Sequence, residues 1–304
     1  MRARAFAPGS IGNVGPGFDV LGLAVEGIGD TVTVELTEGE AKIEVVSGRD
    51  ADLVPLDPAS NVASIAATAW LRARGDRRNP IVRIEKGLPL AGGLGGSAAS
   101  SVAGAFAASL AAEKESLPPE IIAAALEGES AVAGRHLDNI AASVLGGLTI
   151  SRSVDPIDAI AITPAASWWV ALVTPAVRIE TRAARALLPR DWPRAAWVQQ
   201  MANTAALVHA FASGDAGLLR RALDDRYAEP PRSTLIPHFA DAKRAALDAG
   251  AFGCSISGSG PTLFAICSNQ ASAGSVAVAV AHAFDDVEST RHVGPIATRG
   301  VRRT

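Results

Sequence analysis

One glycine-rich segment, Pro89–Ala99, constrains this chain more than any other feature. Its sequence, PLAGGLGGSAA, lies between an apolar strand-like run and a run of small residues typical of a helix. Glycine lets the main chain adopt positive φ and approach a ligand closely, and the free N–H groups at a helix start favour an anion. The segment therefore predicts a loop that holds the phosphates of a nucleotide.

Two common phosphate loops fit this segment poorly. A Walker-type loop has Lys followed by Ser or Thr after its glycines, whereas Lys86 precedes the glycines here. A dinucleotide-binding loop matches the spacing of Gly93, Gly95 and Ala98, but it should lead through a helix to a strand that ends in an acidic residue. The chain continues with two helical runs and no β-branched run between them. A glycine turn that only connects two elements is the remaining alternative.

The composition indicates a globular protein without a nucleic-acid or membrane role. The chain has 304 residues, 48% hydrophobic and 19% charged, which is enough for one large or two modest domains. A net charge of -3 without a basic block argues against nucleic-acid binding. We find no apolar stretch of about 20 residues and no signal peptide, so we expect a cytoplasmic protein. Cys254 and Cys267 lie in apolar runs, which favours buried thiols, and the histidines show no metal-ligand spacing.

The first half of the chain alternates short strand signals with glycine turns before it becomes helical. Strands are predicted at 31–36 and 41–46, paired as a hairpin, and at 81–85 and 148–151. Helices are predicted at 61–74, with Ser60 or Asn61 as the cap and Gly75 as the stop, from Ser97 to Ala112, and at 120–127. Polar residues and a proline near 151–156 indicate a domain boundary, which divides the chain into 1–154 and 155–304.

The second half predicts a mixture of strands and helices. The strands are expected at 168–173, 254–257 and 262–267, and the helices at 181–188, 194–212 and 238–249, followed by a terminal helix and strand.

Two further segments are rich in glycine. Residues 7–22, APGSIGNVGPGFDVLG, contain one amide and one carboxylate, Asn13 and Asp19, in an otherwise apolar frame. Residues 250–266 predict a strand, a tight glycine turn and a second strand. Either segment alone would be equally consistent with a structural turn.

Together, in their order and spacing, the three glycine segments resemble the three motifs of the GHMP kinase superfamily. The resemblance spans nearly the whole chain. Within the superfamily it is greatest to the homoserine kinase family, because the segments 136–139 (HLDN), 181–189 (TRAARALLP) and 229–237 (EPPRSTLIP) also fit that pattern. It implies an α+β fold of two domains: an N-terminal ATP-binding domain like ribosomal protein S5 domain 2, and a ferredoxin-like C-terminal domain.

The activity implied by the resemblance is ATP-dependent phosphorylation of the side-chain hydroxyl of L-homoserine, on the route to threonine. For phosphoryl transfer, a protein must bind the phosphates and a Mg²⁺ ion and must align the acceptor hydroxyl with the transferred phosphate. Ser97 and Glu129 would serve Mg²⁺ as hard oxygen ligands, although an N-cap and a solvated helix face are the ordinary alternatives. The backbone that would hold ATP comprises Pro89, Leu90, Ala91, Gly92, Gly93, Leu94, Gly95, Gly96, Ser97, Ala98 and Ala99.

The resemblance also implies a pocket for an amino acid. Arg185 and Arg232 match the family's carboxylate-binding arginines, and each charge-assisted hydrogen bond would contribute roughly 1.5–3 kcal/mol. Asp19, Asp138 and Asn13 match the residues at the ammonium and hydroxyl end, with His136 and Asn139 beside them. The catalytic candidates are Asp138, Asn139 and Asn13, and Asp138 either accepts the hydroxyl proton or orients the hydroxyl. Singly, each of these residues also has an ordinary structural explanation.

Five positions depart from the family pattern, namely Gly12, Ala91, Gly96, Ala142 and Pro231. Ala91 matters if its position needs a positive φ, and Gly96 lacks a hydroxyl that could touch phosphate. Two rival functions remain: a GHMP kinase for another small molecule, such as mevalonate or shikimate, and a non-catalytic nucleotide-binding protein. The family suggests a homodimer, and we expect neither a nucleic-acid nor a membrane partner.

Overall fold

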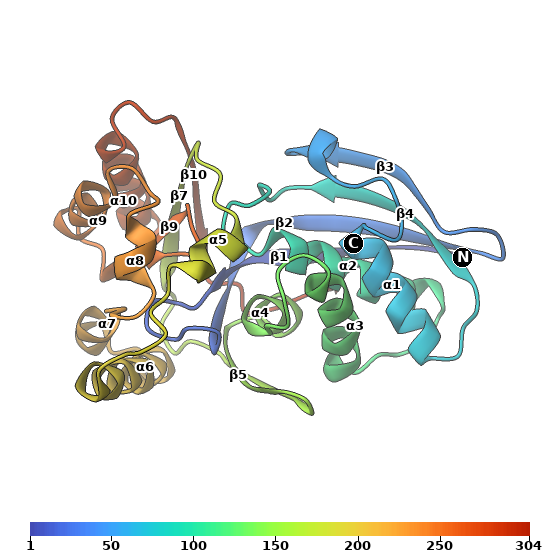
Figure 1. Ribbon diagram of the computed structural model, residues 1–304, viewed down its shortest axis with the longest axis horizontal. Coiled ribbons are helices and arrows are strands. Elements are labelled where there is room, and N and C mark those ends of the chain that lie inside the picture. Colours follow the sequence, from blue (N-terminus) through green and yellow to red (C-terminus); the bar gives the residue numbers. More distant parts are fainter.

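A computed structural model describes residues 1–304, which form two β-sheets with helices packed around them (Figure 1). The first sheet has the strand order β11-β1-β2-β4-β3, and β5 and β6 extend it from β2. Its strands are β1 (Arg2–Gly12), β2 (Leu21–Thr37), β3 (Lys42–Gly48), β4 (Asn79–Lys86), β5 (Leu148–Val154), β6 (Ile157–Ile162) and β11 (Arg302–Arg303).

Four helices pack against this sheet on one side: α1 (Val62–Ala73), α2 (Gly96–Ala111), α3 (Pro118–Ser130) and α4 (Asp138–Leu145). A short 3₁₀ helix, η1 (Ala51–Leu53), follows β3. The small residues of α2 allow close packing, since a Cβ at Gly104 would lie 2.4 Å from the Ala63 carbonyl oxygen. The Asn61 side chain caps α1 by accepting from two backbone N–H groups, and Gly75 follows the helix with a φ of 70°.

The second sheet is antiparallel, with the strand order β10-β7-β9-β8. It consists of β7 (Trp169–Pro175), β8 (Gly253–Ile256), β9 (Leu263–Cys267) and β10 (Ser289–Pro295). The remaining helices are α5 (Thr181–Ala186), α6 (Arg194–Ser213), α7 (Ala216–Ala222), α8 (Glu229–Ser233), α9 (Phe239–Asp248) and α10 (Gln270–Ala283). This strand order and the placement of the helices are ferredoxin-like, so the expected α+β fold with two sheets is confirmed.

The two sheets share one hydrophobic core. A cluster of 50 buried residues includes Ile11 and Leu23 from the first sheet together with Phe264 from the second sheet and Phe211 from α6. A second cluster of 18 residues fills the space between the other face of the second sheet and the helices α9 and α10. The first cluster fixes one sheet against the other, and the two sheets flank the cavity described below.

Most predicted elements are present within a few residues of their expected bounds, but two predictions were wrong. The hairpin of 31–36 with 41–46 does not form, because β4 lies between β2 and β3, and β3 pairs with β4 in parallel. The connection through α1 is long enough for this crossover. Ser97 is not the first residue of its helix, since α2 begins at Gly96 with Gly95 as its N-cap. No helix combines the length and the apolar character needed to cross a membrane.

Candidate active site

The three glycine segments, far apart in the sequence, are hydrogen-bonded to one another. The Gly258 N–H donates to the Gly12 carbonyl oxygen at 3.1 Å, which joins the last segment to the first. The Ser257 hydroxyl donates to the Gly93 carbonyl oxygen at 2.6 Å, which joins the last segment to the predicted phosphate loop. The loop is therefore supported by the opposite half of the molecule.

The backbone of the phosphate loop requires glycine at two positions. Gly93 and Gly95 have φ values of 77° and 64°. A Cβ would lie 2.4 Å from the Ser257 carbonyl oxygen at Gly93, and 2.3 Å from the Ser10 hydroxyl at Gly95. Ala91, one of the departures from the family pattern, also has a positive φ, 53°. An alanine in this left-handed region strains the loop.

A buried ion pair lies beneath the loop. The Lys86 ammonium contacts the Asp30 carboxylate and donates to the Gly96 carbonyl oxygen at 3.1 Å and to the Ser100 hydroxyl at 3.0 Å. Asp30 also accepts from the two backbone N–H groups that follow Lys86, at 3.0 and 3.1 Å. This network links the end of β4 to the start of α2, so that both ends of the phosphate loop are fixed.

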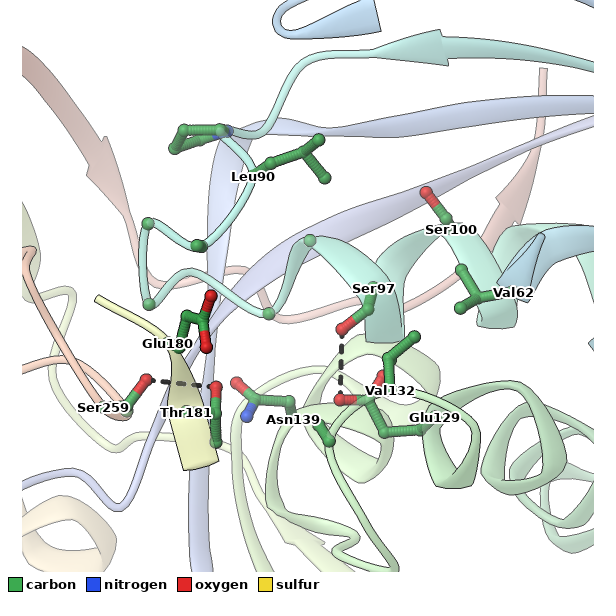
Figure 2. A pocket seen from close by; sticks show the side chains of 18 of the residues that line it. Val62, Leu90, Ser97, Ser100, Glu129, Val132, Asn139, Glu180, Thr181 and Ser259 are labelled. Carbon is green, nitrogen blue, oxygen red and sulfur yellow. Dashed lines mark hydrogen bonds between the residues drawn. The ribbon is translucent and has the colours of Figure 1, made fainter. Parts of the chain in front are cut away.

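Ser97 and Glu129 face one another across the cavity floor (Figure 2). The Ser97 hydroxyl donates to Oε1 of Glu129 at 3.1 Å. The Glu129 side chain is buried and its Oε2 has no hydrogen-bond partner. Burial raises the pKa of this carboxyl to about 7. A buried carboxylate with a free oxygen beside a hydroxyl fits Mg²⁺, which takes one or two protein carboxylates and completes its shell with phosphates and water.

Asp138, Asn13 and Asn139 form a second polar group. Asp138, the first residue of α4, accepts from the Asn13 N–H at 3.3 Å, and Asn139 accepts from the Ser10 hydroxyl at 3.0 Å. Burial, followed by the nearby Asp19 charge, raises the pKa of Asp138 to about 6. Asp138 is therefore ionised at neutral pH and has the charge needed to accept a proton.

Gly12 departs from the family pattern for a visible reason. A Cβ at this position would lie 2.7 Å from Oδ2 of Asp138 and 2.8 Å from Nδ2 of Asn139. Only glycine fits here without displacing these two side chains.

Asp19 and Arg185 form a bidentate ion pair, with nitrogen–oxygen distances of 3.0 and 2.8 Å. Nδ1 of His136 lies 3.5 Å from the same carboxylate. The pKa of His136 is lowered, chiefly by burial, which disfavours the charged form of its ring. The resemblance assigns Asp19 to the substrate's ammonium group and Arg185 to its carboxylate. These two side chains are therefore in direct contact with one another.

Arg232 is buried on α8 and donates to the Gly258 carbonyl oxygen at 2.9 Å. Both arginines lie over the Phe18 ring, and the Arg185 and Arg232 guanidinium carbons are 5.2 and 5.3 Å from its centroid. The Nε atoms of both arginines have no hydrogen-bond partner. Two guanidinium groups with spare donors therefore converge on one part of the site.

These groups line one cavity of about 540 Å³. The predicted residues that line it are Asn13, Asp19, Pro89, Leu90, Ala91, Gly92, Gly93, Gly95, Gly96, Ser97, Glu129, His136, Asp138, Asn139, Arg185 and Arg232. Three residues of the predicted loop, Leu94, Ala98 and Ala99, do not line the cavity because their side chains pack into the core.

The sequence analysis missed two parts of the cavity wall. One is an apolar end, to which we assign Leu53, Val54, Pro55, Val62 and Val132 together with the loop residue Leu90, all of which line the cavity. The other lies at α5, where Arg178 and Glu180 precede the motif segment 181–189, and Thr181 and Arg182 are residues of that segment to which no site role was given. The Thr181 and Ser259 hydroxyls, which Figure 2 shows joined by a hydrogen bond on this side, have their oxygens 3.3 Å apart. The apolar residues come from distant segments, so no local pattern could have revealed them.

Comparisons with known proteins agree with this geometry. Residues 61–147 match the GHMP kinase N-terminal domain, and residues 207–286 match the GHMP kinase C-terminal region. The homoserine kinase of Chloroherpeton thalassium is 38% identical over 98% of both chains. That of Pyrococcus abyssi is 41% identical over 88% of this chain and 89% of its own.

Solved structures are similar as well. The crystal structure of homoserine kinase from Cytophaga hutchinsonii is 36% identical, superposes with a TM-score of 0.95, and covers 100% of this chain and 97% of that one. The crystal structure of L. major mevalonate kinase, at 14% identity over 96% of this chain and 95% of its own, has a TM-score of 0.73 and shows the same fold.

Proposed function

Because the chain belongs to the GHMP kinase superfamily and, within it, to the homoserine kinase family, we propose that it phosphorylates the side-chain hydroxyl of L-homoserine with ATP. The product is O-phospho-L-homoserine, an intermediate of threonine biosynthesis. One observation carries the proposal beyond family membership. The Asp19–Arg185 ion pair and the buried Arg232 line the same cavity as the phosphate loop.

The nucleotide occupies the part of the cavity between the glycine loop and the apolar end. Backbone N–H groups at the start of α2 and the positive end of its dipole favour the phosphates. Val62, Leu90 and Val132 offer an apolar surface to the base. Ser97 and Glu129 would hold Mg²⁺, and the ion would supply positive charge to the phosphates.

The amino acid binds beside the phosphate loop. Its carboxylate is held by Arg185 and Arg232, whose free Nε–H groups face no protein acceptor. Its ammonium group pairs with Asp19. Because a zwitterion carries one charge of each sign, it enters between Asp19 and Arg185 without leaving either charge unpaired. The side-chain hydroxyl then reaches Asp138, with Asn13 and Asn139 beside it, and Asp138 accepts or orients its proton.

Arg232→Ala tests the substrate assignment. Removal of this guanidinium should raise the KM for L-homoserine by about 10- to 100-fold, the value of one charge-assisted hydrogen bond, with the KM for ATP almost unchanged. Arg244→Ala, which removes an exposed arginine of α9, is the matched control and should change neither KM. Equal increases in both KM values would refute the assignment of Arg232 to the amino acid.

The remaining parts of the proposal come from the sequence and its resemblance alone. They are a homodimer, a cytoplasmic location, and a division of the chain at residue 154 into an ATP-binding N-terminal domain and a C-terminal domain. Light scattering on the purified chain measures the oligomeric state directly.

A further inference from the structure

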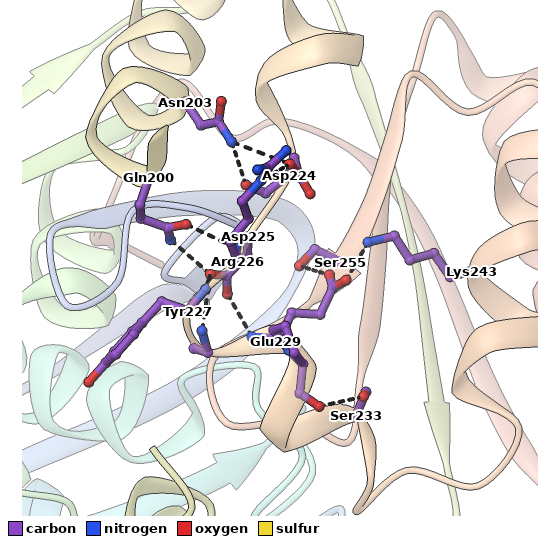
Figure 3. Close-up of polar contacts among 12 residues, drawn as sticks. Gln200, Asn203, Asp224, Asp225, Arg226, Tyr227, Glu229, Ser233, Lys243 and Ser255 are labelled. Atoms are coloured by element: carbon purple, nitrogen blue, oxygen red, sulfur yellow. Dashed lines mark hydrogen bonds and ion pairs between the residues drawn. The ribbon is translucent and has the colours of Figure 1, made fainter. Parts of the chain in front are cut away.

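A buried glutamine outside the cavity connects the two segments that form the amino-acid pocket. Gln200, on α6, donates from Nε2 to the Pro16 carbonyl oxygen at 2.9 Å. The same nitrogen lies 2.8 Å from Oδ1 of Asp225, to which it donates a hydrogen bond (Figure 3). Its Oε1 accepts from the Arg226 N–H at 2.9 Å. The amide orientation is set by this pattern, since one end only donates and the other only accepts.

Asp225 organises the chain that leads into α8. Its Oδ1 accepts from the N–H groups of Tyr227 and Ala228 at 2.9 and 3.1 Å, and its Oδ2 accepts from the Glu229 N–H at 2.9 Å. No cation forms a salt bridge with this buried carboxylate, and its hydrogen-bond donors are the three N–H groups and the Gln200 amide. One helical turn later the same helix carries Arg232.

Pro16 lies in the turn between Asn13 and Asp19. Its carbonyl oxygen accepts a second bond, from the Thr204 hydroxyl of α6 at 2.8 Å. Two donors on α6 therefore hold this turn in place. The first glycine segment and α8 thus share one anchor.

Phe18 connects this anchor to both arginines. Its ring packs edge-on against Tyr227, with centroids 5.1 Å apart, and Tyr227 is one of the residues that Asp225 holds. Both guanidinium groups lie over the Phe18 ring. Two like charges directed at one space repel one another, so their positions must be set by a rigid surround.

We propose that Gln200 and Asp225 are positioning residues of the amino-acid pocket, which set Asp19 and Arg232 at the separation that the substrate needs. This inference rests on the proposed function. Neither residue lines the cavity, so their effect is transmitted through the Pro16 carbonyl and the start of α8. A displacement of about 1 Å in such a site is sufficient to reduce its effectiveness about 100-fold.

Gln200→Met tests the proposal because it keeps the length of the side chain and removes the amide. We expect the KM for L-homoserine to rise about tenfold or more and the KM for ATP to change less than about twofold, because the phosphate loop has separate supports. Thr204→Val removes only the second donor to Pro16 and should raise the same KM by about threefold. It provides the test if Gln200→Met does not fold.

Leu207→Ala is the matched control. Leu207 is buried on the same helix, belongs to the shared hydrophobic core and does not line the cavity. This variant should lose stability with both KM values unchanged, so a KM effect in Gln200→Met is separated from a general loss of packing.

The outcomes distinguish this inference from the function on which it rests. A wild-type chain that does not phosphorylate homoserine removes the proposed function and the inference with it. If the wild type is active, an unchanged homoserine KM in Gln200→Met and Thr204→Val overturns the inference alone. A parallel rise in the two KM values, or an equal shift in Leu207→Ala, also overturns it.

Discussion

Asp138 is the residue at which stability and the proposed chemistry conflict most directly. Its carboxyl has a pKa of about 6 in the fold, above the ordinary 3.8, because it is buried. Between these two pH values the carboxyl is protonated in the folded protein and ionised in the unfolded chain. The free energy of unfolding therefore falls as the pH rises from about 4 to about 7. The difference amounts to about 3 kcal/mol.

Asp138→Asn should therefore make the free protein more stable relative to wild type near pH 8 than near pH 4, with a change of up to about 3 kcal/mol. Urea unfolding of both proteins at the two pH values measures it. The same variant should lose kcat by about 10²- to 10⁴-fold if Asp138 accepts the hydroxyl proton. A smaller loss would assign it the orienting role, and a pH-independent stability difference would contradict the burial argument.

Ala91 tests the backbone of the phosphate loop. Its left-handed φ of 53° costs an alanine about 1–2 kcal/mol. A glycine avoids this strain but loses more conformational entropy on folding, which cancels a part of the gain. Ala91→Gly should stabilise the protein by about 0.5 kcal/mol and leave or lower the KM for ATP. Ala123→Gly, at an exposed position within α3, is the control and should destabilise by about 1 kcal/mol. Destabilisation in both variants would show that Ala91 is not strained.

At the scale of elements, the Lys86–Asp30 pair fixes α2 to the end of β4. Lys86→Met leaves the Asp30 carboxylate buried without a cation, which should cost about 3–5 kcal/mol of stability and raise the KM for ATP. The double variant Lys86→Met/Asp30→Asn should regain most of the stability, because no charge remains buried. Its KM for ATP should stay raised, since the Gly96 carbonyl has lost its ammonium donor.

Thermal unfolding and steady-state kinetics of the three proteins separate these effects. A double variant as unstable as Lys86→Met would show that the cost does not come from an unpaired charge.

An element is predicted from the sequence where the interactions that define it lie within a few residues of one another. The helix at α1 was predicted with Ser60 or Asn61 as its cap and Gly75 as its stop, because caps and stops act within one turn; Asn61 is the cap in the structure. The predicted pairing of β3 with β2 was wrong, because alternating apolar residues indicate a strand but do not determine which strand it pairs with. The catalytic candidates near Asp138 came from motif residues, whereas the ion pair of Arg185 with Asp19 depends on how the two halves meet.

At the scale of the whole molecule, the shared core predicts cooperative unfolding. Trp168 and Phe264 of the second half pack in one cluster with Ile11 and Leu23 of the first, so neither sheet keeps a complete core without the other. We expect a single calorimetric transition whose calorimetric and van't Hoff enthalpies agree. Two resolved transitions would contradict a shared core.

The cavity shows the limit of sequence reasoning at this scale. The glycine segments were predicted to act together because of their order and spacing. The apolar end near Val62 and Val132 was not found, because these residues become neighbours only when α1 packs beside α3. The anchor at Gln200 was not found, because Gln200 meets Pro16 only when the second half of the chain packs on the first.

The most direct test of the central claim is the initial rate of ADP formation by the purified chain with Mg-ATP. The acceptors to compare are L-homoserine, mevalonate, shikimate and none. The site predicts turnover with L-homoserine alone, because only this acceptor offers a carboxylate to Arg185 and Arg232 together with an ammonium group for Asp19. Turnover with another acceptor, or none with homoserine despite ATP binding, would contradict the account.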